Sequence, residues 1–217
     1  MNYNLAYYTY FVSLAYASFF GIYRFKKLDI ASRILSVLVC SALINESIGF
    51  YLSIKLGSNM ALYAIYCLIE YGMLCLYFNK IIDVFIKRNI GIYIGIGGII
   101  FGILNLVFIQ NLDSLNSYFL FFEGLMVIGM SLFACTRLLL KNDVPYLFRY
   151  PHFWFLCILV FFWSITFLNW GLYDYVNLKL KKTAWEINFS LQIICIITYF
   201  CLGTVFLLYP KMQTNYE

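Results

Sequence analysis

Charged side chains are scarce in this sequence. Asp, Glu, Lys and Arg make up 12% of its 217 residues and 64% are apolar, whereas a typical soluble domain has about 25% charged residues. So few charged groups cannot coat a water-soluble globule. The apolar residues fall in blocks of about 20, the helix length that crosses about 30 Å of hydrocarbon. The sequence therefore predicts a polytopic integral membrane protein.

The sequence has a single histidine and no closely spaced cysteine pair, which excludes several kinds of metal and catalytic site. His152 is the only histidine, so a zinc site built on several histidines and an HExxH metalloprotease motif are excluded. We expect its ring to lie at the membrane interface with a wet polar tip. The seven cysteines form no CxxC pair and are odd in number, so they are expected to be structural thiols. The sequence indicates no catalytic residue, cofactor or metal ligand.

Proline is rare, and a secretory signal is not apparent. The three prolines, Pro145, Pro151 and Pro210, fall near the boundaries of apolar blocks, as expected of residues that disrupt helix interiors. No basic residue precedes Arg24, and no small-residue cleavage site follows the first block. We therefore expect the first block to remain as a membrane span.

Seven apolar blocks predict an all-α, seven-transmembrane-helix bundle that forms one domain over residues 1–217. No repeat, low-complexity tract or long linker divides the chain, and no connection is large enough for a soluble domain. Residues 110–117, QNLDSLNS, are predicted to form a polar turn. The expected spans are residues 3–23, 31–54, 58–79, 90–109, 116–138, 153–173 and 185–208.

Lys and Arg are distributed unevenly between the two sides of these spans. Eleven of the 15 lie on the first, third and fifth connections and in the C-terminal tail. The positive-inside rule places this side in the cytoplasm, with the N-terminus outside and the C-terminus cytoplasmic. Lys179, Lys181 and Lys182 run against the trend. The net charge of +5 is therefore a topology signal, and no basic patch on a soluble face predicts a nucleic-acid partner.

Four glutamates, Glu46, Glu70, Glu123 and Glu186, lie within the predicted spans. An ionisable side chain at mid-membrane costs at least about 2.5–3.5 kcal/mol, so such residues normally face the bundle interior or water. The predicted directions of the spans place all four in the central and outer part of the bundle, whereas most basic residues lie at the inner face. Glu186 is expected near water, either solvated or paired with a lysine of the preceding connection.

Polar residues recur at helical spacing around these glutamates. The third span carries a polar face made of Asn59, Tyr63, Tyr66, Glu70 and Tyr77. Four further spans carry similar stripes, and buried polar groups in hydrocarbon need hydrogen-bond partners. We therefore expect the stripes to meet in a shared polar interior. The residues predicted to bind a ligand there are Asn45, Glu46, Tyr63, Tyr66, Glu70, Glu123, Asn169 and Gln192.

Two interpretations of the glutamates stay open at this stage. In the first, hydrogen bonds from buried carboxyl groups simply hold helices together. In the second they form a site, for which three functions are considered. The leading one is binding or sensing a small or lipid-like ligand in a cavity open to the outer leaflet, with a partner protein at the inner face. The others are a proton- or cation-coupled small-solute transporter and an intramembrane lipid-modifying enzyme with paired glutamates.

The fourth span contains the stretch GIYIGIGGIIFG, with two GxxxG pairs formed by Gly91, Gly95, Gly98 and Gly102. Small residues let helix backbones approach closely in lipid. The stretch predicts tight helix packing, either within the bundle or in a homodimer. It does not predict a phosphate-binding loop, because no strand precedes it.

Several runs are similar to those of small, seven-span bacterial membrane proteins to which no activity is assigned. The runs are NESIGFYL, YAIYCLIEYGMLCLYF, LNSYFLFFEGLMVIGMSL and YPHFWFLCILVFFWSITF, and the resemblance covers most of the chain. Shared features are a Glu in each of three spans and a Pro-x-Phe-Trp entry to the sixth. The resemblance implies a heptahelical protein of the bacterial inner (cytoplasmic) membrane, with no catalytic residue to carry over.

Overall fold

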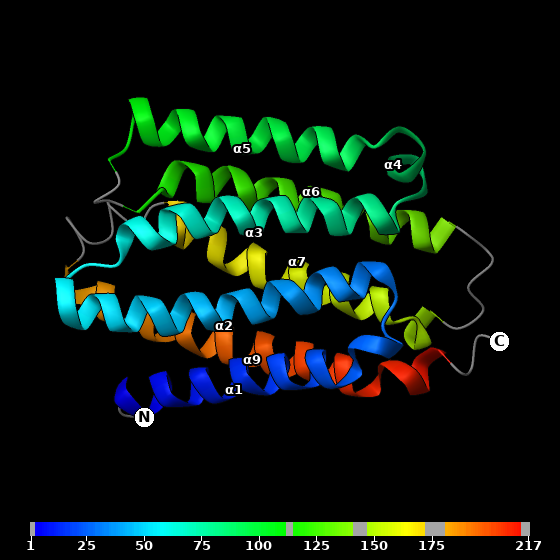
Figure 1. The fold of residues 1–217 in the computed structure, drawn as a ribbon, viewed down its shortest axis with the longest axis horizontal. Coiled ribbons are helices and arrows are strands. Elements are labelled where there is room, and N and C mark those ends of the chain that lie inside the picture. Colours follow the sequence, from blue (N-terminus) through cyan, green and yellow to red (C-terminus); the bar gives the residue numbers. More distant parts are fainter. Residues whose placement is uncertain (1–2, 112–114, 141–146, 172–180, 214–217) are drawn as a thin grey trace.

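Each apolar block of the sequence forms one long α-helix (Figure 1). The computed structural model describes residues 3–111, 115–140, 147–171 and 181–213. All seven long helices have the length and hydropathy of membrane spans, which indicates an integral membrane protein. They are α1 (Tyr3–Arg24), α2 (Ile30–Leu56), α3 (Met60–Ile81), α5 (Ile90–Phe108), α6 (Ser117–Leu140), α7 (Pro151–Gly171) and α9 (Lys181–Gln213).

The seven predicted spans are confirmed as helices, with boundaries that differ by a few residues. Residues 172 and 173 of the sixth predicted span lie outside the described residues, as does Pro145. Pro151 occupies the first position of α7, where its missing N–H costs nothing. The expectation that Pro210 lies outside a helix is wrong, because α9 continues past it to Gln213. Three short elements were not predicted: α4 (Asp83–Arg88) and two 3-10 helices, Phe25–Lys27 and Leu147–Arg149.

Local capping sets where the helices begin and end. Asp29 precedes α2, and its side chain accepts a hydrogen bond from the backbone N–H of Ser32 at 2.9 Å, a standard N-cap. Gly57 ends α2 in the left-handed conformation at φ 75°, which costs a glycine little. Asn89 joins α4 to α5 at φ 51°, a region that asparagine tolerates better than most residues.

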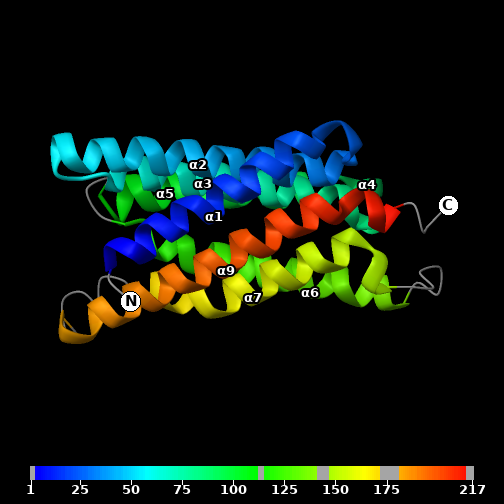
Figure 2. The ribbon, with the colours of Figure 1, turned by 90° about the horizontal axis from the view of Figure 1, so that it is seen from below.

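Six of the seven long helices form a closed ring, and α5 lies outside it. Each ring helix packs against the next in the order α1, α2, α3, α6, α7, α9. The ring is closed because α9 also packs along α1. Figure 1 shows α5 on one edge of the bundle and α1 with α9 on the opposite edge. Figure 2 shows α1 and α9 side by side, with the chain starting and finishing at opposite ends of the bundle.

The glycines of α5 lie against α3 of the same chain. Gly91, Gly95, Gly98 and Gly102 are all buried. A Cβ atom at Gly98 would overlap the Tyr71 ring of α3. The four glycines thus allow close helix packing within one chain, which is one of the two predicted alternatives; the other was a homodimer. A homodimer through them stays a prediction, and it would require α3 to leave this face.

Apolar side chains cover the outside of the bundle, and polar ones lie within it. Phe108 is 78% exposed and Val107 is 67% exposed, whereas Thr166 and Ser131 are fully buried. A monomeric soluble protein rarely exposes large contiguous apolar patches. This distribution is the one expected of a bundle surrounded by lipid.

The two ends of the bundle differ in charge. The starts of α2, α5 and α7 and the ends of α1, α3, α6 and α9 lie at one end, on the right in Figure 1. Most Lys and Arg side chains of the described segments lie there, among them Arg24, Lys26, Lys87 and Arg149. This is called the basic end below. Which end faces the cytoplasm stays a prediction.

Candidate functional site

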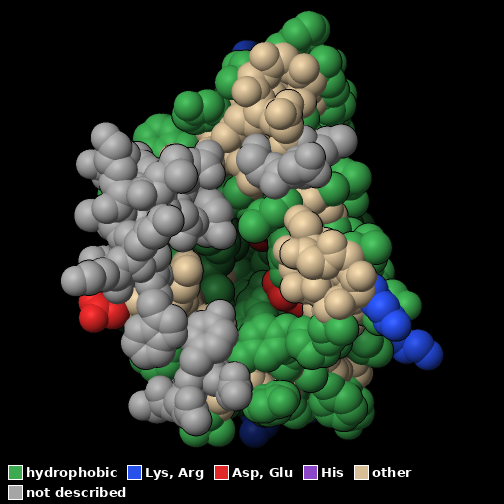
Figure 3. Space-filling model, turned by 90° about the vertical axis from the view of Figure 1, so that its left-hand side faces the viewer, with side chains coloured by type: hydrophobic (Ala, Val, Ile, Leu, Met, Phe, Trp, Pro, Cys, Tyr) green, Lys and Arg blue, Asp and Glu red, His purple; other side chains and the backbone are tan. Residues whose placement is uncertain are grey.

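A cavity of about 400 Å³ lies inside the ring, in the half of the bundle opposite the basic end. All six ring helices or the residues just before them contribute to its lining, and α5 does not. Seen from that end, the molecule is hollowed, and acidic side chains are visible inside the hollow (Figure 3). The volume lies within the range of about 300–1,000 Å³ typical of small-molecule pockets.

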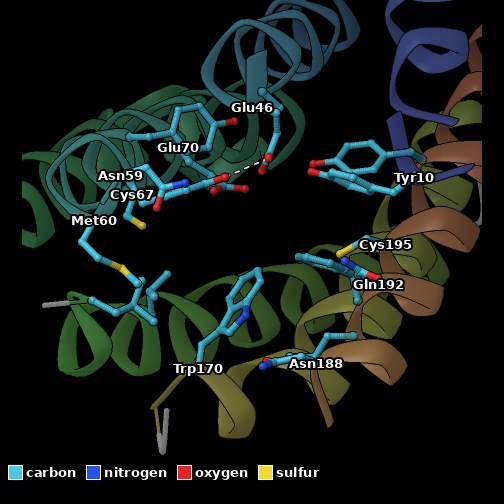
Figure 4. Close-up of a pocket in the computed structure, with 18 of the residues that line it drawn as sticks. Tyr10, Glu46, Asn59, Met60, Cys67, Glu70, Trp170, Asn188, Gln192 and Cys195 are labelled. Carbon is cyan, nitrogen blue, oxygen red and sulfur yellow. Dashed lines mark hydrogen bonds between the residues drawn. The ribbon is translucent and has the colours of Figure 1, made fainter. Parts of the chain in front are cut away.

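Two carboxylates from neighbouring helices face this cavity. Glu46 projects from α2 and accepts a hydrogen bond from the Tyr63 hydroxyl of α3, with an O–O distance of 2.8 Å (Figure 4). Glu70 lies ten residues into α3, about 15 Å along the helix axis, and therefore near the middle of the bundle. It makes no hydrogen bond to any residue that the structure describes. The carboxyl groups of the two glutamates are close enough to interact electrostatically.

The described lining contains no Lys, Arg or His that could neutralise these carboxylates. Much of it is aromatic. Tyr10 of α1 and Tyr199 of α9 pack with ring centroids 5.9 Å apart. Trp170 and Phe162 of α7 meet edge to face at 5.7 Å. The cavity thus combines acidic groups with several ring systems in one enclosed space.

Amide side chains complete the polar part of the lining. Asn59 donates to the backbone carbonyl of Gly49 at 3.2 Å, which joins the start of α3 to α2. Asn188 and Gln192 line the cavity from α9. In Figure 4 they lie across the space from Glu46 and Glu70, with Tyr10 to one side. A ligand in this space would therefore meet acidic groups on one wall and amides on the other.

The structure brings together five of the eight predicted ligand-binding residues. Asn45 is buried on α2 but does not belong to the lining. Asn169 donates to the backbone carbonyl of Ile165 on its own helix at 2.8 Å and is also outside the lining. Glu123 is not part of the lining either. The five that face the cavity are Glu46, Tyr63, Tyr66, Glu70 and Gln192.

Glu123 lies behind the cavity, in the interior between α6 and α3. It is fully buried, and neither carboxyl oxygen has a hydrogen-bond partner in the described structure. Its carboxyl group lies within electrostatic range of Glu70 and of the polar groups of Tyr66 and Cys67. Buried polar groups are almost always satisfied, so an orphaned carboxyl needs an explanation. Glu123 is thus a third acidic residue close to Glu70, but it lies deeper in the bundle and does not line the cavity.

Several lining residues were not predicted, and some of them lie far from any carboxylate in the sequence. The first span has no acidic residue, yet Tyr7 and Tyr10 of α1 line the cavity. A signal was available: Tyr3, Tyr7 and Tyr10 are spaced by four and three residues, which places them on one helical face. Trp170, too, lines the cavity.

A second polar cluster lies at the basic end. His152 at the start of α7 is only 4% exposed, so the expected wet interfacial ring is wrong. Its Nε2 lies 2.9 Å from Asp29 Oδ2, and its Nδ1 lies 3.4 Å from the Tyr77 hydroxyl. Burial raises the pKa of Asp29, but the hydrogen bond and charge of His152 and hydrogen bonds from Ser32 outweigh burial and hold that pKa below its usual value. The cluster ties α2, α3 and α7 together.

Metal chemistry has no candidate donor set here: in the described segments, no group of three or more His, Cys, Asp or Glu side chains could hold a metal ion. Neither a protein-family model nor a curated protein nor a solved structure matches this chain. The resemblance to small seven-span bacterial proteins therefore stays an expectation.

Proposed function

We propose that the protein is an integral membrane protein that binds or senses a small or lipid-like ligand in the cavity within its helix ring. The observation that supports this proposal is the cavity of about 400 Å³, lined by six helices and holding two carboxylates without a basic partner in the described lining. In the proposed topology the cavity opens outward and the basic end faces the cytoplasm of a bacterial inner membrane.

The environment of Glu70 favours binding over a purely structural role. A glutamate that only held helices together would use its oxygens in bonds to neighbouring helices. Glu70 has no such bond among the described residues and instead faces the cavity. Because buried polar groups need partners, its partner is either water or a ligand. Glu46, by contrast, combines both roles, since it faces the cavity and also accepts from Tyr63.

Sensing requires a way to pass the signal on. The connections between helices are short, and none provides a soluble effector domain. A response to ligand would therefore pass through a partner protein at the basic end. Arg24, Lys87 and Arg149 would give that partner a positively charged surface to recognise.

A second candidate is a proton-coupled transporter, which the position of Glu123 favours. Glu46 and Glu70 line the cavity and Glu123 follows behind them, so carboxyl groups lead from the cavity into the bundle. Against this candidate, the long helices run without a break at mid-span, whereas transporter sites are often built on broken helices. Uptake of solute into proteoliposomes that depends on pH and is lost in Glu70→Gln would favour transport.

The binding proposal is tested with three probes that share one body and differ in charge: 2-phenylethylamine, 2-phenylethanol and phenylacetate. Thermal unfolding of the purified protein is measured with and without each probe. At least one probe is expected to raise the melting temperature of the wild type. Glu70→Gln is expected to unfold at a similar temperature without probe but to bind the effective probe about tenfold or more weakly, because it removes a desolvated charge.

Glu186→Gln provides the matched control. Glu186 is exposed at the start of α9 and is not part of the described lining. The same chemical change there is expected to leave probe binding intact. If no probe stabilises the wild type, and Glu70→Gln only lowers the melting temperature, the glutamates are structural and the proposal fails.

A further inference from the structure

We propose that the cavity selects an organic ammonium cation, a ligand with a protonated amine and an apolar body. This inference rests on the proposed function and specifies the ligand class of the same site. It follows from three properties of the lining: two carboxyl groups without a basic residue in the described lining, aromatic rings beside them, and apolar side chains in the same cavity.

The first property is the sign of the charge. Glu46 and Glu70 face one cavity, and no described lining residue is basic. Glu123, buried behind them, adds a third acidic group within interaction range of Glu70. A carboxylate removed from water needs a partner of opposite sign, and a cation beside Glu46 and Glu70 supplies one. An anionic ligand would be repelled by these carboxylates.

The second property is the placement of the aromatic rings. The hydroxyl of Tyr63 bonds directly to Glu46, and Tyr10 and Tyr199 also lie within electrostatic range of that carboxylate. Ring faces attract a cation through their quadrupole, most strongly when water is excluded. Because the rings and the carboxylate line the same space, an ammonium group placed beside Glu46 can contact both.

The third property separates an organic cation from a bare metal ion. Hard cations such as Ca²⁺ take six to eight oxygen ligands. Although the described lining holds amide and tyrosine oxygens besides the two carboxylates, no group of three or more His, Cys, Asp or Glu side chains in the described segments could hold a metal ion. Other lining side chains are apolar, including Leu120, Phe162 and Leu191. These side chains would leave a hydrated ion unsatisfied, but they can pack against the hydrocarbon part of an amine. The volume of about 400 Å³ is also far larger than a single ion needs.

The three probes named above test the inference by calorimetric titration of the protein in detergent at neutral pH. We expect 2-phenylethylamine, which is then protonated, to bind about tenfold or more tightly than 2-phenylethanol, with phenylacetate weakest. Glu46→Gln and Glu70→Gln should each weaken the amine about tenfold and change 2-phenylethanol much less. Glu186→Gln should leave the binding of both unchanged.

A second arm asks whether the amine is a free solute or a lipid headgroup. Phosphatidylethanolamine carries an ammonium group, whereas phosphatidylglycerol does not. Titration of 2-phenylethylamine is repeated in nanodiscs of phosphatidylglycerol alone and of a mixture with phosphatidylethanolamine. Weaker binding in the mixture assigns the cavity to the lipid headgroup. Equal binding in both assigns it to a soluble amine.

The outcomes separate the inference from the proposed function. If 2-phenylethanol or phenylacetate binds as tightly as the amine, the cavity binds ligands without selecting cations, and only the inference is overturned. If none of the three binds the wild type, both are overturned. Because the probe comparison uses the wild-type protein, it remains decisive even where a glutamate variant does not fold.

Discussion

At the scale of single residues, Asp29 shows how one carboxylate serves two purposes. Its Oδ1 caps α2 by accepting from the backbone of Ser32, while Oδ2 lies 2.9 Å from His152 Nε2. The Asp29 backbone N–H donates to the Tyr209 hydroxyl of α9 at 3.3 Å. One residue thus joins the start of α2 to α7 and α9, and its removal is expected to loosen the basic end.

The low pKa of Asp29 predicts how its contribution depends on pH. Its folded pKa lies below the unfolded value of about 3.9. The carboxylate therefore stabilises the fold above that value, and this contribution is lost as the pH falls toward the folded pKa. Asp29→Asn is expected to lower the melting temperature at pH 7, and its difference from the wild type should shrink below about pH 4.

Thermal unfolding followed by tryptophan fluorescence, in steps from pH 7 to pH 3, measures this difference. Glu186→Gln, a carboxylate change at an exposed position, should show a small difference at every pH. If the melting temperature of Asp29→Asn is below that of the wild type by the same amount at pH 7 and at pH 3, the charge of Asp29 does not stabilise the basic end.

Residues of the site differ in how far the sequence could predict them. Glu46 and Glu70 were predictable because a carboxylate in an apolar block has a high cost unless it faces a polar interior. Asn45 and Asn169 were not, because a small rotation of a helix about its axis decides whether a side chain meets the cavity or its own backbone. The role of His152 depends on Asp29, which lies 123 residues earlier in the chain.

At the scale of elements, the contact between α5 and α3 depends on glycines, which have no side chain to hold the helices apart. Gly98 faces the Tyr71 ring, whereas a Cβ atom added at Gly97, the preceding residue, would meet no atom of another described helix within 4 Å. Gly98→Ala would force either the buried Tyr71 ring or the helix to move, and overpacking of this kind typically costs about 1–3 kcal/mol. Gly97→Ala should be neutral or slightly stabilising, because alanine is the better helix former.

Thermal unfolding of the two variants in the same detergent tests this contrast. A lower melting temperature in Gly98→Ala alone supports packing within one chain. If Gly98→Ala instead keeps its melting temperature and changes only the apparent mass in size-exclusion chromatography, the glycines join two copies. The sequence predicted close packing of α5 but not its partner, since a GxxxG pattern does not specify which helix it meets.

The structure adds side-chain bonds to the polar turn predicted at residues 110–117, of which residues 112–114 lie outside the described residues. Asn105 Nδ2 donates to Gln110 Oε1 at 2.8 Å and also to Asn116 Oδ1, and Gln110 Nε2 donates to Ser117 Oγ at 2.8 Å. All four residues are buried. The polar side chains of this connection indicate a turn. In lipid, amide side chains such as these also form hydrogen bonds with one another. The network holds the end of α5 against the start of α6, beside the cavity lining at Leu115.

At the scale of the whole molecule, helix number was predictable but ring closure was not. Hydropathy identifies each span by itself, because every span must cross the same thickness of hydrocarbon. The order of helices around a bundle depends on side-chain packing, which hydropathy does not encode. The pairing of α1 with α9 therefore appears only in the structure, although it completes the ring and brings Tyr7 and Tyr10 to the cavity.

Orientation in the membrane is the property of the whole molecule on which an outward-facing cavity depends. Positive charge at the basic end predicts that this end is cytoplasmic. In a variant without its native cysteines, a single cysteine at Ser58, which is exposed between α2 and α3, should react with a membrane-impermeant maleimide in intact spheroplasts. A cysteine at Lys87, exposed in α4 at the basic end, should react only after the membrane is permeabilised. The opposite pattern would place the cavity on the cytoplasmic side, so that its ligand and any signalling partner would exchange sides.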